Sequence, residues 1–157
     1  MTKPIKGIMT FVASIVGFVI VALIALSIMS RYTGDPGLRG GHLQECPVTP
    51  NCVVSEDVDG KNIDPIDISG MEASVAWQRL NEAVVATGGE VKEDDGHYLR
   101  ATYSSAVFRF IDDFEARLDE ENNVIHLRSA SRVGHGDMGA NQKRVARIVA
   151  QFQNTTD

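Results

Sequence analysis

A run of 22 residues without a charge, from Ile8 to Met29, sets the first limit on how this chain can fold. A helix rises about 1.5 Å per residue, so a helix of this length covers about 33 Å and can cross the core of a bilayer. Lys3 and Lys6 precede the run and Arg31 follows it. A first span with a basic leader usually keeps its N-terminus in the cytoplasm. The run therefore predicts a single-pass signal anchor in the inner membrane, with the rest of the chain on the periplasmic or exterior side.

This anchor divides the chain into four predicted parts. They are a cytoplasmic N-terminus at 1–7, a transmembrane anchor at 8–29, a linker at 30–42 and an extracytoplasmic domain at 43–153. A cleaved signal peptide is the alternative, because the small residues in "ALS" at 25–27 resemble a cleavage pattern. The apolar run is longer than the usual hydrophobic part of a signal peptide, which favours the uncleaved anchor.

Charge is distributed unevenly along the chain. The net charge is −6, but residues 35–121 hold 19 acids and 7 bases, whereas residues 122–157 hold 5 bases and 2 acids. An acidic body lacks the broad basic face of a nucleic-acid-binding domain, so we expect no nucleic-acid partner. The basic C-terminal segment leaves two interpretations open: a localised anion site, or internal pairing with the acidic body.

The two cysteines, Cys46 and Cys52, lie close together in "CPVTPNC". The two prolines between them favour a turn that brings the sulfurs within bonding reach. In an oxidising compartment this pattern predicts a local disulfide, which would hold down an irregular segment. The spacing is not that of a redox motif, and no spaced histidine pair supplies further metal ligands. We therefore expect neither a metal nor a cofactor.

Hydrophobic periodicity predicts an α+β domain beyond residue 68. An amphipathic helix capped by Ser69 ends at Gly88 and Gly89. Alternation then predicts a four-stranded antiparallel meander packed with two helices and preceded by the transmembrane helix. The four strands are expected at 90–93, 97–103, 106–118 and 124–133, and the second helix of the domain at 140–152.

Four polar residues lie on the predicted inward faces of these elements. The alternating pattern places Asp112 on the same strand face as Phe108 and Phe110, a face that is otherwise apolar. Ser129 and Ser131 fall on the matching face of the next strand, and Asn141 begins the apolar stripe of the last helix. A buried carboxylate without partners costs several kcal/mol, so these groups are expected to bond one another or a neighbouring arginine. They predict either a structural network that holds the helix to the sheet or the floor of a pocket.

The opposite face of the last two strands carries charged residues. Arg128 and Arg132 point away from Ser129 and are expected to pair with Asp113 and Glu115. Exposed pairs of this kind contribute little to stability.

Two motifs in this chain resemble those of a known family. The first is Cys-Pro-x-x-Pro-Asn-Cys, and the second is Arg-Ser-x-Ser-Arg-x-Gly-x-x-Asp-x-Gly-x-Asn-x-x-Arg. Together they resemble an uncharacterised bacterial and plastid family, domain of unknown function 1499, over roughly residues 43–150. Because that family has no established activity, the resemblance supports the fold and its boundaries more than any function.

The residues favour a binding or structural module over an enzyme. A glycine-flanked helix start with nearby cations suits an anion. The predicted ligand residues are Arg128, Ser129, Ser131, Arg132, Asp137, Gly139, Asn141 and Arg144. A structural role with an envelope protein as partner fits the acidic surface equally well. The alternative is a hydrolase that uses Ser129 or Ser131 with His135 and either Asp137 or Asp112, although the spacing matches no nucleophile-elbow motif.

Overall fold

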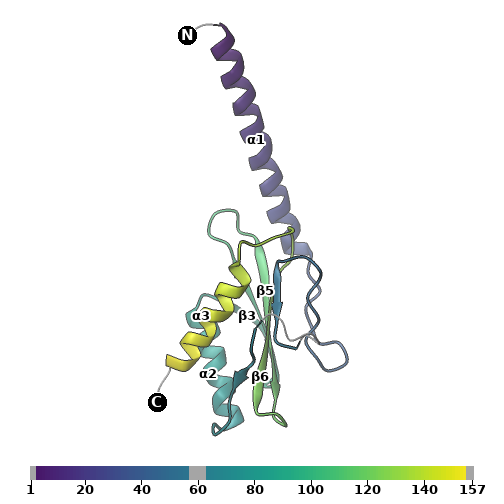
Figure 1. The fold of residues 1–157 in the computed structure, drawn as a ribbon, viewed down its shortest axis with the longest axis vertical. Coiled ribbons are helices and arrows are strands. Elements are labelled where there is room, and N and C mark those ends of the chain that lie inside the picture. Colours follow the sequence, from purple (N-terminus) through teal and green to yellow (C-terminus); the bar gives the residue numbers. More distant parts are fainter. Residues whose placement is uncertain (1–2, 57–62, 155–157) are drawn as a thin grey trace.

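The computed structural model describes residues 3–56 and 63–154 (Figure 1). Met1 and Thr2, part of the predicted cytoplasmic N-terminus, lie outside the described residues. The chain has an α+β fold, as predicted. Its elements in order are α1 Lys3–Tyr32, β1 Cys52–Val54, β2 Ile66–Asp67, α2 Ala73–Ala86, β3 Glu90–Asp94, β4 Tyr98–Ser104, β5 Ile111–Asp119, β6 Val124–Ser131 and α3 Ala140–Asn154.

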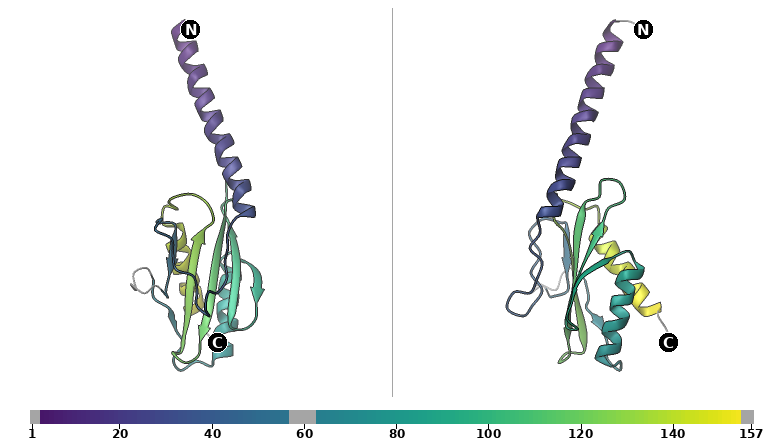
Figure 2. Two further views of the ribbon diagram at one scale, coloured as in Figure 1. Left: turned by 90° about the vertical axis from the view of Figure 1, so that its right-hand side faces the viewer. Right: turned by 180° about the vertical axis from the view of Figure 1, so that it is seen from behind.

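Helix α1 extends away from the rest of the molecule (Figures 1 and 2). Its apolar side chains, such as Phe18, are largely exposed along this extension. The segment Gly7–Tyr32 is long and apolar enough to cross a membrane. The prediction of a helix of membrane-spanning length is confirmed, whereas its retention as an anchor stays a prediction.

Within the described residues the sheet holds six strands, so the predicted count of four is wrong. The predicted meander is present, because β3, β4, β5 and β6 are consecutive antiparallel neighbours. Two further strands, β1 and β2, pair with the outer edge of β6. They are three and two residues long. Strands this short show no period of two, so alternation could not reveal them.

The third predicted strand begins too early. Residues 105–110 form a turn, in which Ser105 N donates to the carbonyl of Phe110 at 2.9 Å, and β5 starts only at Ile111. Phe108 and Phe110 therefore do not lie on the sheet. The start of α2 also differs, because Glu72, not Ser69, caps the helix by accepting bonds from Ser74 N and Val75 N.

Helices α2 and α3 lie on one face of the sheet (Figure 2). Their apolar stripes share one core with the inward side chains of the strands. This core includes Trp77, Leu80, Val84, Leu99, Phe114, Ile125, Leu127 and Ile148. Because this core lies on one face of the sheet, a separate segment has to cover the other face.

The segment between α1 and β1 covers part of that other face. Leu43 and Val54 are buried there and form a small apolar cluster with Tyr98 of β4. The predicted disulfide is present, and it joins Cys46 in this segment to Cys52, the first residue of β1. A covalent clip stiffens an irregular segment that has few apolar contacts of its own.

Removing the disulfide should destabilise the segment that covers this face of the sheet. The double substitution Cys46→Ser/Cys52→Ser releases a short loop, and chain entropy for a loop of this length predicts a loss of about 2 kcal/mol. Thermal unfolding of the full chain in detergent, measured for this variant and for the oxidised parent, tests the prediction. An unchanged midpoint would show that the fold holds the segment without the disulfide.

Candidate functional site

Strand β6 divides the predicted ligand residues between the two faces of the sheet. Ser129 and Ser131 face α3, and the side chains of Arg128 and Arg132 bond partners on the opposite face. Successive side chains of a strand point to opposite faces, so neighbours in the sequence end up on different surfaces. The eight residues therefore form two groups, not one site.

Asp112, Ser129, Ser131 and Asn141 lie together beneath the start of α3. The hydroxyl of Ser129 donates to Asn141 Oδ1 at 2.7 Å. Asn141 Nδ2 donates to the hydroxyl of Ser131 at 3.0 Å. Asp112 is directly opposite Ser131 in the β5–β6 register, and its carboxylate accepts a bond from Arg144 Nη2 at 2.5 Å. A continuous polar network thus joins β5, β6 and α3.

Arg144 is the centre of this network. It is 6% exposed, and its Nη1 atom donates to Ser129 Oγ at 2.8 Å and also to Asn141 Oδ1. Its guanidinium lies over the ring of Tyr103, 4.7 Å from the centroid. The sequence predicts a neighbouring arginine as a partner of this cluster, but it places Arg144 among the ligand residues and does not identify it as that partner. The signal was present, because a residue three positions after an inward-facing Asn141 lies on the same face of a helix.

The network also reaches the disulfide segment through Asn51. Asn141 Nδ2 donates to the carbonyl of Asn51 at 2.9 Å, and Asn51 Nδ2 donates to the carbonyl of Gly134 at 2.8 Å. Asn51 is buried, although it lies in an irregular segment that no periodicity marks as important. The two sequence motifs of the chain therefore contact each other in space.

Asp137 occupies the start of α3. Its carboxylate accepts bonds from Gly139 N at 2.9 Å and Asn141 N at 2.8 Å. Burial opposes ionisation of Asp137, but the backbone N–H groups of Asn141 and Gly139 outweigh it and lower the pKa. The helix start thus already holds its own carboxylate, so an external anion would have to bind beside the helix end.

An open groove of about 680 Å³ lies beside this helix end. Lys143 and Arg147 line it and are exposed, Arg144 lines it from its buried position, and Met138 stands almost fully exposed at 95%. Asp137 is the one acidic residue of the lining. Because Asp112 already pairs with Arg144, the lining keeps two cations, Lys143 and Arg147, against Asp137, and this excess of positive charge suits a small anion.

Removing the Arg144 guanidinium should lower the free energy of unfolding far more than removing a surface charge does. Arg144→Met leaves Asp112 without its ion pair, and we expect a loss of about 3 kcal/mol. Arg147→Met, on the same helix but exposed, should change stability by less than about 0.5 kcal/mol. The double variant Asp112→Asn/Arg144→Met should recover part of the loss. Denaturant unfolding of the three variants provides the measurement, and equal effects of both arginines would contradict the network.

The opposite face of β6 carries the pairs that the sequence predicted. Arg132 binds Asp113 through two bonds of 2.7 Å, and Arg128 Nη1 donates to Glu115 at 2.6 Å. Glu115 is 0% exposed and also accepts from the hydroxyl of Tyr98 at 2.8 Å. Burial, together with the Glu115 charge, raises the pKa of Tyr98. These pairs are buried, not exposed as a surface pair would be, so their removal should cost more than the sequence suggested.

A second charged cluster, not predicted from the sequence, lies farther along this face. Glu56 accepts bonds from Arg117 at 2.5 and 3.0 Å, and the Arg117 guanidinium also donates to Asp119 at 3.1 Å. His126 Nδ1 lies 3.1 Å from Ser55 Oγ. Burial opposes ionisation of Asp119, but bonds from Asn122 and Arg117 hold its pKa at about 2.

The Ser55–His126 pair is not arranged as a catalytic dyad with an orienting acid. His126 Nε2 is 3.8 Å from Asp119 and 3.9 Å from Glu56, too far for hydrogen bonds. The hydroxyl of Ser55 also accepts from Leu127 N at 2.8 Å. Glu56 also accepts a bond from Leu43 N at 2.7 Å, so the cluster fastens the covering segment to the sheet, and Ser55 bonds β6 from the residues just after β1.

His126 should make stability depend on pH. Burial lowers its pKa below 6.5, against the opposing charge of Glu56. His126 then binds a proton more readily in the unfolded chain than in the folded one. Its contribution to the free energy of unfolding should therefore be complete above about pH 6.5 and fall as the pH drops towards the folded-state pKa. His126→Gln should flatten this decline, because glutamine does not titrate. Unfolding midpoints of the parent and the variant between about pH 7.5 and 5.5 test this, and parallel curves for the two proteins would refute it.

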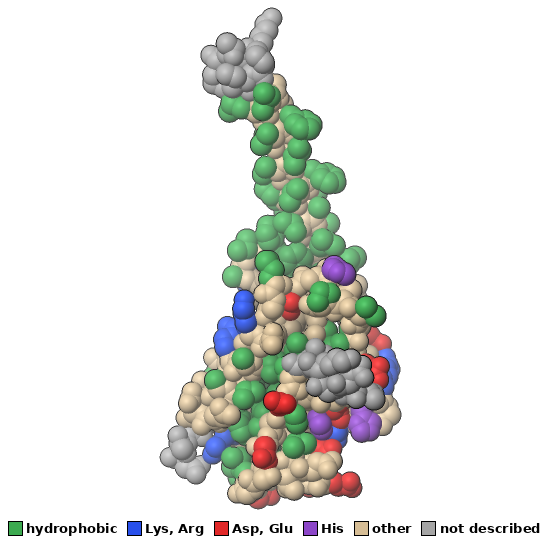
Figure 3. Space-filling model, viewed as in Figure 1, with side chains coloured by type: hydrophobic (Ala, Val, Ile, Leu, Met, Phe, Trp, Pro, Cys, Tyr) green, Lys and Arg blue, Asp and Glu red, His purple; other side chains and the backbone are tan. Residues whose placement is uncertain are grey.

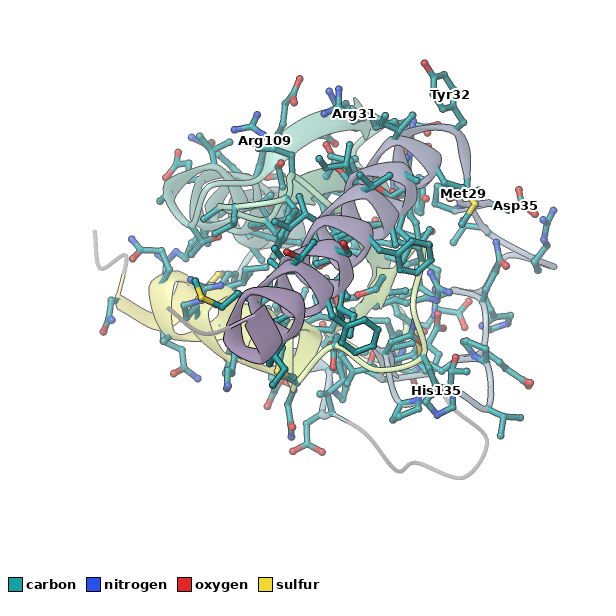
Figure 4. All side chains as sticks on the ribbon, turned by 90° about the horizontal axis from the view of Figure 1, so that it is seen from above. Met29, Arg31, Tyr32, Asp35, Arg109 and His135 are labelled. Carbon is teal, nitrogen blue, oxygen red and sulfur yellow. A yellow bond between two sulfur atoms is a disulfide. The ribbon has the colours of Figure 1, made fainter. Side chains whose placement is uncertain are left out.

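The residues of the hydrolase alternative are not assembled. His135 lies on an exposed loop at the α1 end of the domain (Figure 4). The hydrogen bonds of Ser129 and Ser131 within the described residues go to Asn141, Arg144 and backbone groups, and none goes to a histidine. Across residues 3–56 and 63–154, no group of three His, Cys, Asp or Glu side chains could hold a metal ion.

Comparison with known proteins identifies a family for this chain. No curated protein matches the chain. The family model described as "Protein of unknown function (DUF1499)" matches residues 42–152. The matched region runs from the covering segment to the last turns of α3, so it contains both polar clusters. The chain therefore belongs to the DUF1499 family, whose function is unknown.

Proposed function

We propose that this chain is a membrane-anchored, extracytoplasmic binding module that takes an anionic ligand in the groove beside α3. The observation that carries the proposal is the lining of that groove, where Lys143 and Arg147 are exposed next to the buried Arg144. Arg144 is held in place by Asp112 and Ser129, so the groove has one fixed wall beside two exposed cations. Binding sites combine a preformed shape with a few charged groups in this way.

The location outside the cytoplasm is supported by two features. A disulfide such as Cys46–Cys52 persists in oxidising compartments and is rare in the cytosol. The basic leader before the apolar run favours an N-terminus in the cytoplasm, which would leave the domain on the periplasmic or exterior side of the inner membrane.

Binding fits the site better than hydrolysis does, because the motif serines are already engaged. Ser129 both donates to Asn141 and accepts from Arg144, which leaves its hydroxyl without a base. A nucleophilic serine needs an adjacent base to accept its proton. In this proposal the motif is a scaffold that positions α3, and the ligand contacts the outer surface of the helix.

Native mass spectrometry of the full chain, extracted in mild detergent, tests the proposal. We expect an anionic species to accompany the protein and to be lost in Lys143→Ala/Arg147→Ala. The control Arg39→Ala/Lys92→Ala removes the same number of charges elsewhere and should retain the species. A bare protein, or a species that survives the groove substitutions, would contradict the anion site. Protein partners captured in place of a small ligand would favour an assembly role with another envelope protein.

A further inference from the structure

The last turns of α1 are fastened to the domain. Ser27 and Ser30 are 4% and 0% exposed, although both lie at the end of an otherwise exposed apolar helix. The hydroxyl of Ser27 donates to the carbonyl of Phe108, and Ser30 Oγ accepts from Ile111 N at 3.1 Å. Arg132 Nη1 donates to the carbonyl of Ser30 at 3.2 Å. These bonds join α1 to the domain as one unit, without a flexible tether between them.

This attachment fixes the height of the 105–110 turn relative to the apolar run. Ser27 lies inside the uncharged run and Ser30 follows directly after it, before Arg31. When α1 crosses a bilayer, the residues at the end of the run lie at the boundary between the hydrocarbon and the headgroups. Because Phe108 and Ile111 bond to Ser27 and Ser30, the turn that contains Phe108 must lie at the same boundary.

The turn presents an apolar tip at this height. Val107 is 80% exposed, and the rings of Phe108 and Phe110 pack against each other at 6.1 Å. Two bonds close the turn: Ser105 N donates to the carbonyl of Phe110, and Phe110 N donates to Ser105 Oγ, both at 2.9 Å. An exposed apolar side chain on an ordered turn lacks the internal packing that usually explains such a residue.

Two arginines and a tyrosine surround the end of α1. Arg31 and Arg109 line a hollow of about 230 Å³ that also contains Glu90. Figure 4, viewed along α1 towards the domain, shows Arg31 and Arg109 on the same side of the molecule, with Tyr32 at its edge. Arg109 has a φ of 61°, a left-handed conformation that is uncommon for a long side chain. Arginine binds phosphate through paired bonds, and tyrosine is enriched where membranes meet water.

We propose that the 105–110 turn, with Arg31 and Arg109, is a membrane-contacting surface that rests on the bilayer holding α1. Val107 enters the lipid interface, and the two arginines bind the phosphates of phospholipid headgroups. The apolar surface of α1 continues to the upper end of the domain (Figure 3), so the contact extends an existing lipid-facing surface. The proposal rests on α1 crossing the membrane, and it does not depend on a ligand in the groove beside α3.

A second loop lies at the same end of the domain. The segment between β6 and α3 rises towards α1, and His135 lies on this surface in the view along α1 (Figures 1 and 4). Met138, in the same segment, is 95% exposed and has a φ of 53°. The two loops together would hold the domain upright against the membrane, with β5 leading away from it.

The opposite end of the domain provides the control position. Strand β5 has nine residues and so carries the chain about 30 Å from Ile111 to the β5–β6 turn. The start of α2 lies at that far end, because Ile68 N bonds to the carbonyl of Asn123 in the same turn. Val75, in the first turns of α2, is exposed like Val107 but should remain in water.

Site-directed spin labelling of the full chain in vesicles tests the inference. The described chain has no free cysteine, so Val107→Cys, Phe18→Cys and Val75→Cys each provide one labelling site. The vesicles contain phosphatidylcholine with phosphatidylglycerol, and power saturation compares collisions of each label with oxygen and with a water-soluble nickel chelate. We expect the Val107 label to favour oxygen at least several-fold over the Val75 label, though less than the Phe18 label. Replacing Arg31 and Arg109 by alanine should shift the Val107 label towards the nickel chelate.

The Phe18 label separates failure of the anchor from failure of the inference. A Phe18 label open to the nickel chelate would show that α1 is not in the membrane, which overturns the anchor and the inference together. A lipid-exposed Phe18 label beside a Val107 label that behaves like Val75 would overturn the membrane contact alone. A Val107 label shielded from both reagents would mean that protein covers the turn, which also overturns lipid as its partner.

Discussion

The two-sided use of β6 is the constraint on which the rest of the structure depends. Because successive side chains of β6 point to opposite faces, Ser129 joins the network under α3 and Arg128 forms the ion pair with Glu115. Arg132 then extends the second face to the carbonyl of Ser30 in α1. One strand thus holds the last helix and helix α1 in fixed positions and, through the bond from Gly37 N to Glu115 at 2.6 Å, the covering segment as well. Shifting β6 by one residue would exchange its serines and arginines and break all three attachments at once.

Buried charges on both faces explain why this register is well defined. Glu115 is directly opposite Arg128 in the β5–β6 pairing, and Asp112 is opposite Ser131. A buried ion pair often contributes little net stability, because desolvation offsets most of the attraction. A mispaired buried carboxylate, in contrast, costs several kcal/mol. Pairs of this kind therefore select one alignment of the strands, while the apolar core around Phe114 supplies the stability.

The sequence predicted the repetitive parts of the fold and the chemistry of its inward faces. The meander from β3 to β6, the span of α3 and the disulfide follow from period, turn residues and cysteine spacing. Phe108 and Phe110 were misplaced, because alternation continues through residues 106–110 although the backbone turns there. The role of Asn51 could not be predicted either. Its position depends on the long-range contact between β1 and β6, and an irregular segment encodes such a contact in no local pattern.

The junction between α1 and the domain would set the orientation of the domain on a membrane that α1 crosses. A domain on a flexible tether samples many orientations, so a binding groove on its surface faces the membrane only part of the time. Here Ser27, Ser30 and Arg132 fix the angle between α1 and the sheet. With α1 in a bilayer, the groove beside α3 would have a constant direction relative to the lipid. A ligand drawn from the membrane surface would meet its cations without a search over domain orientations, which lowers the entropic cost of binding.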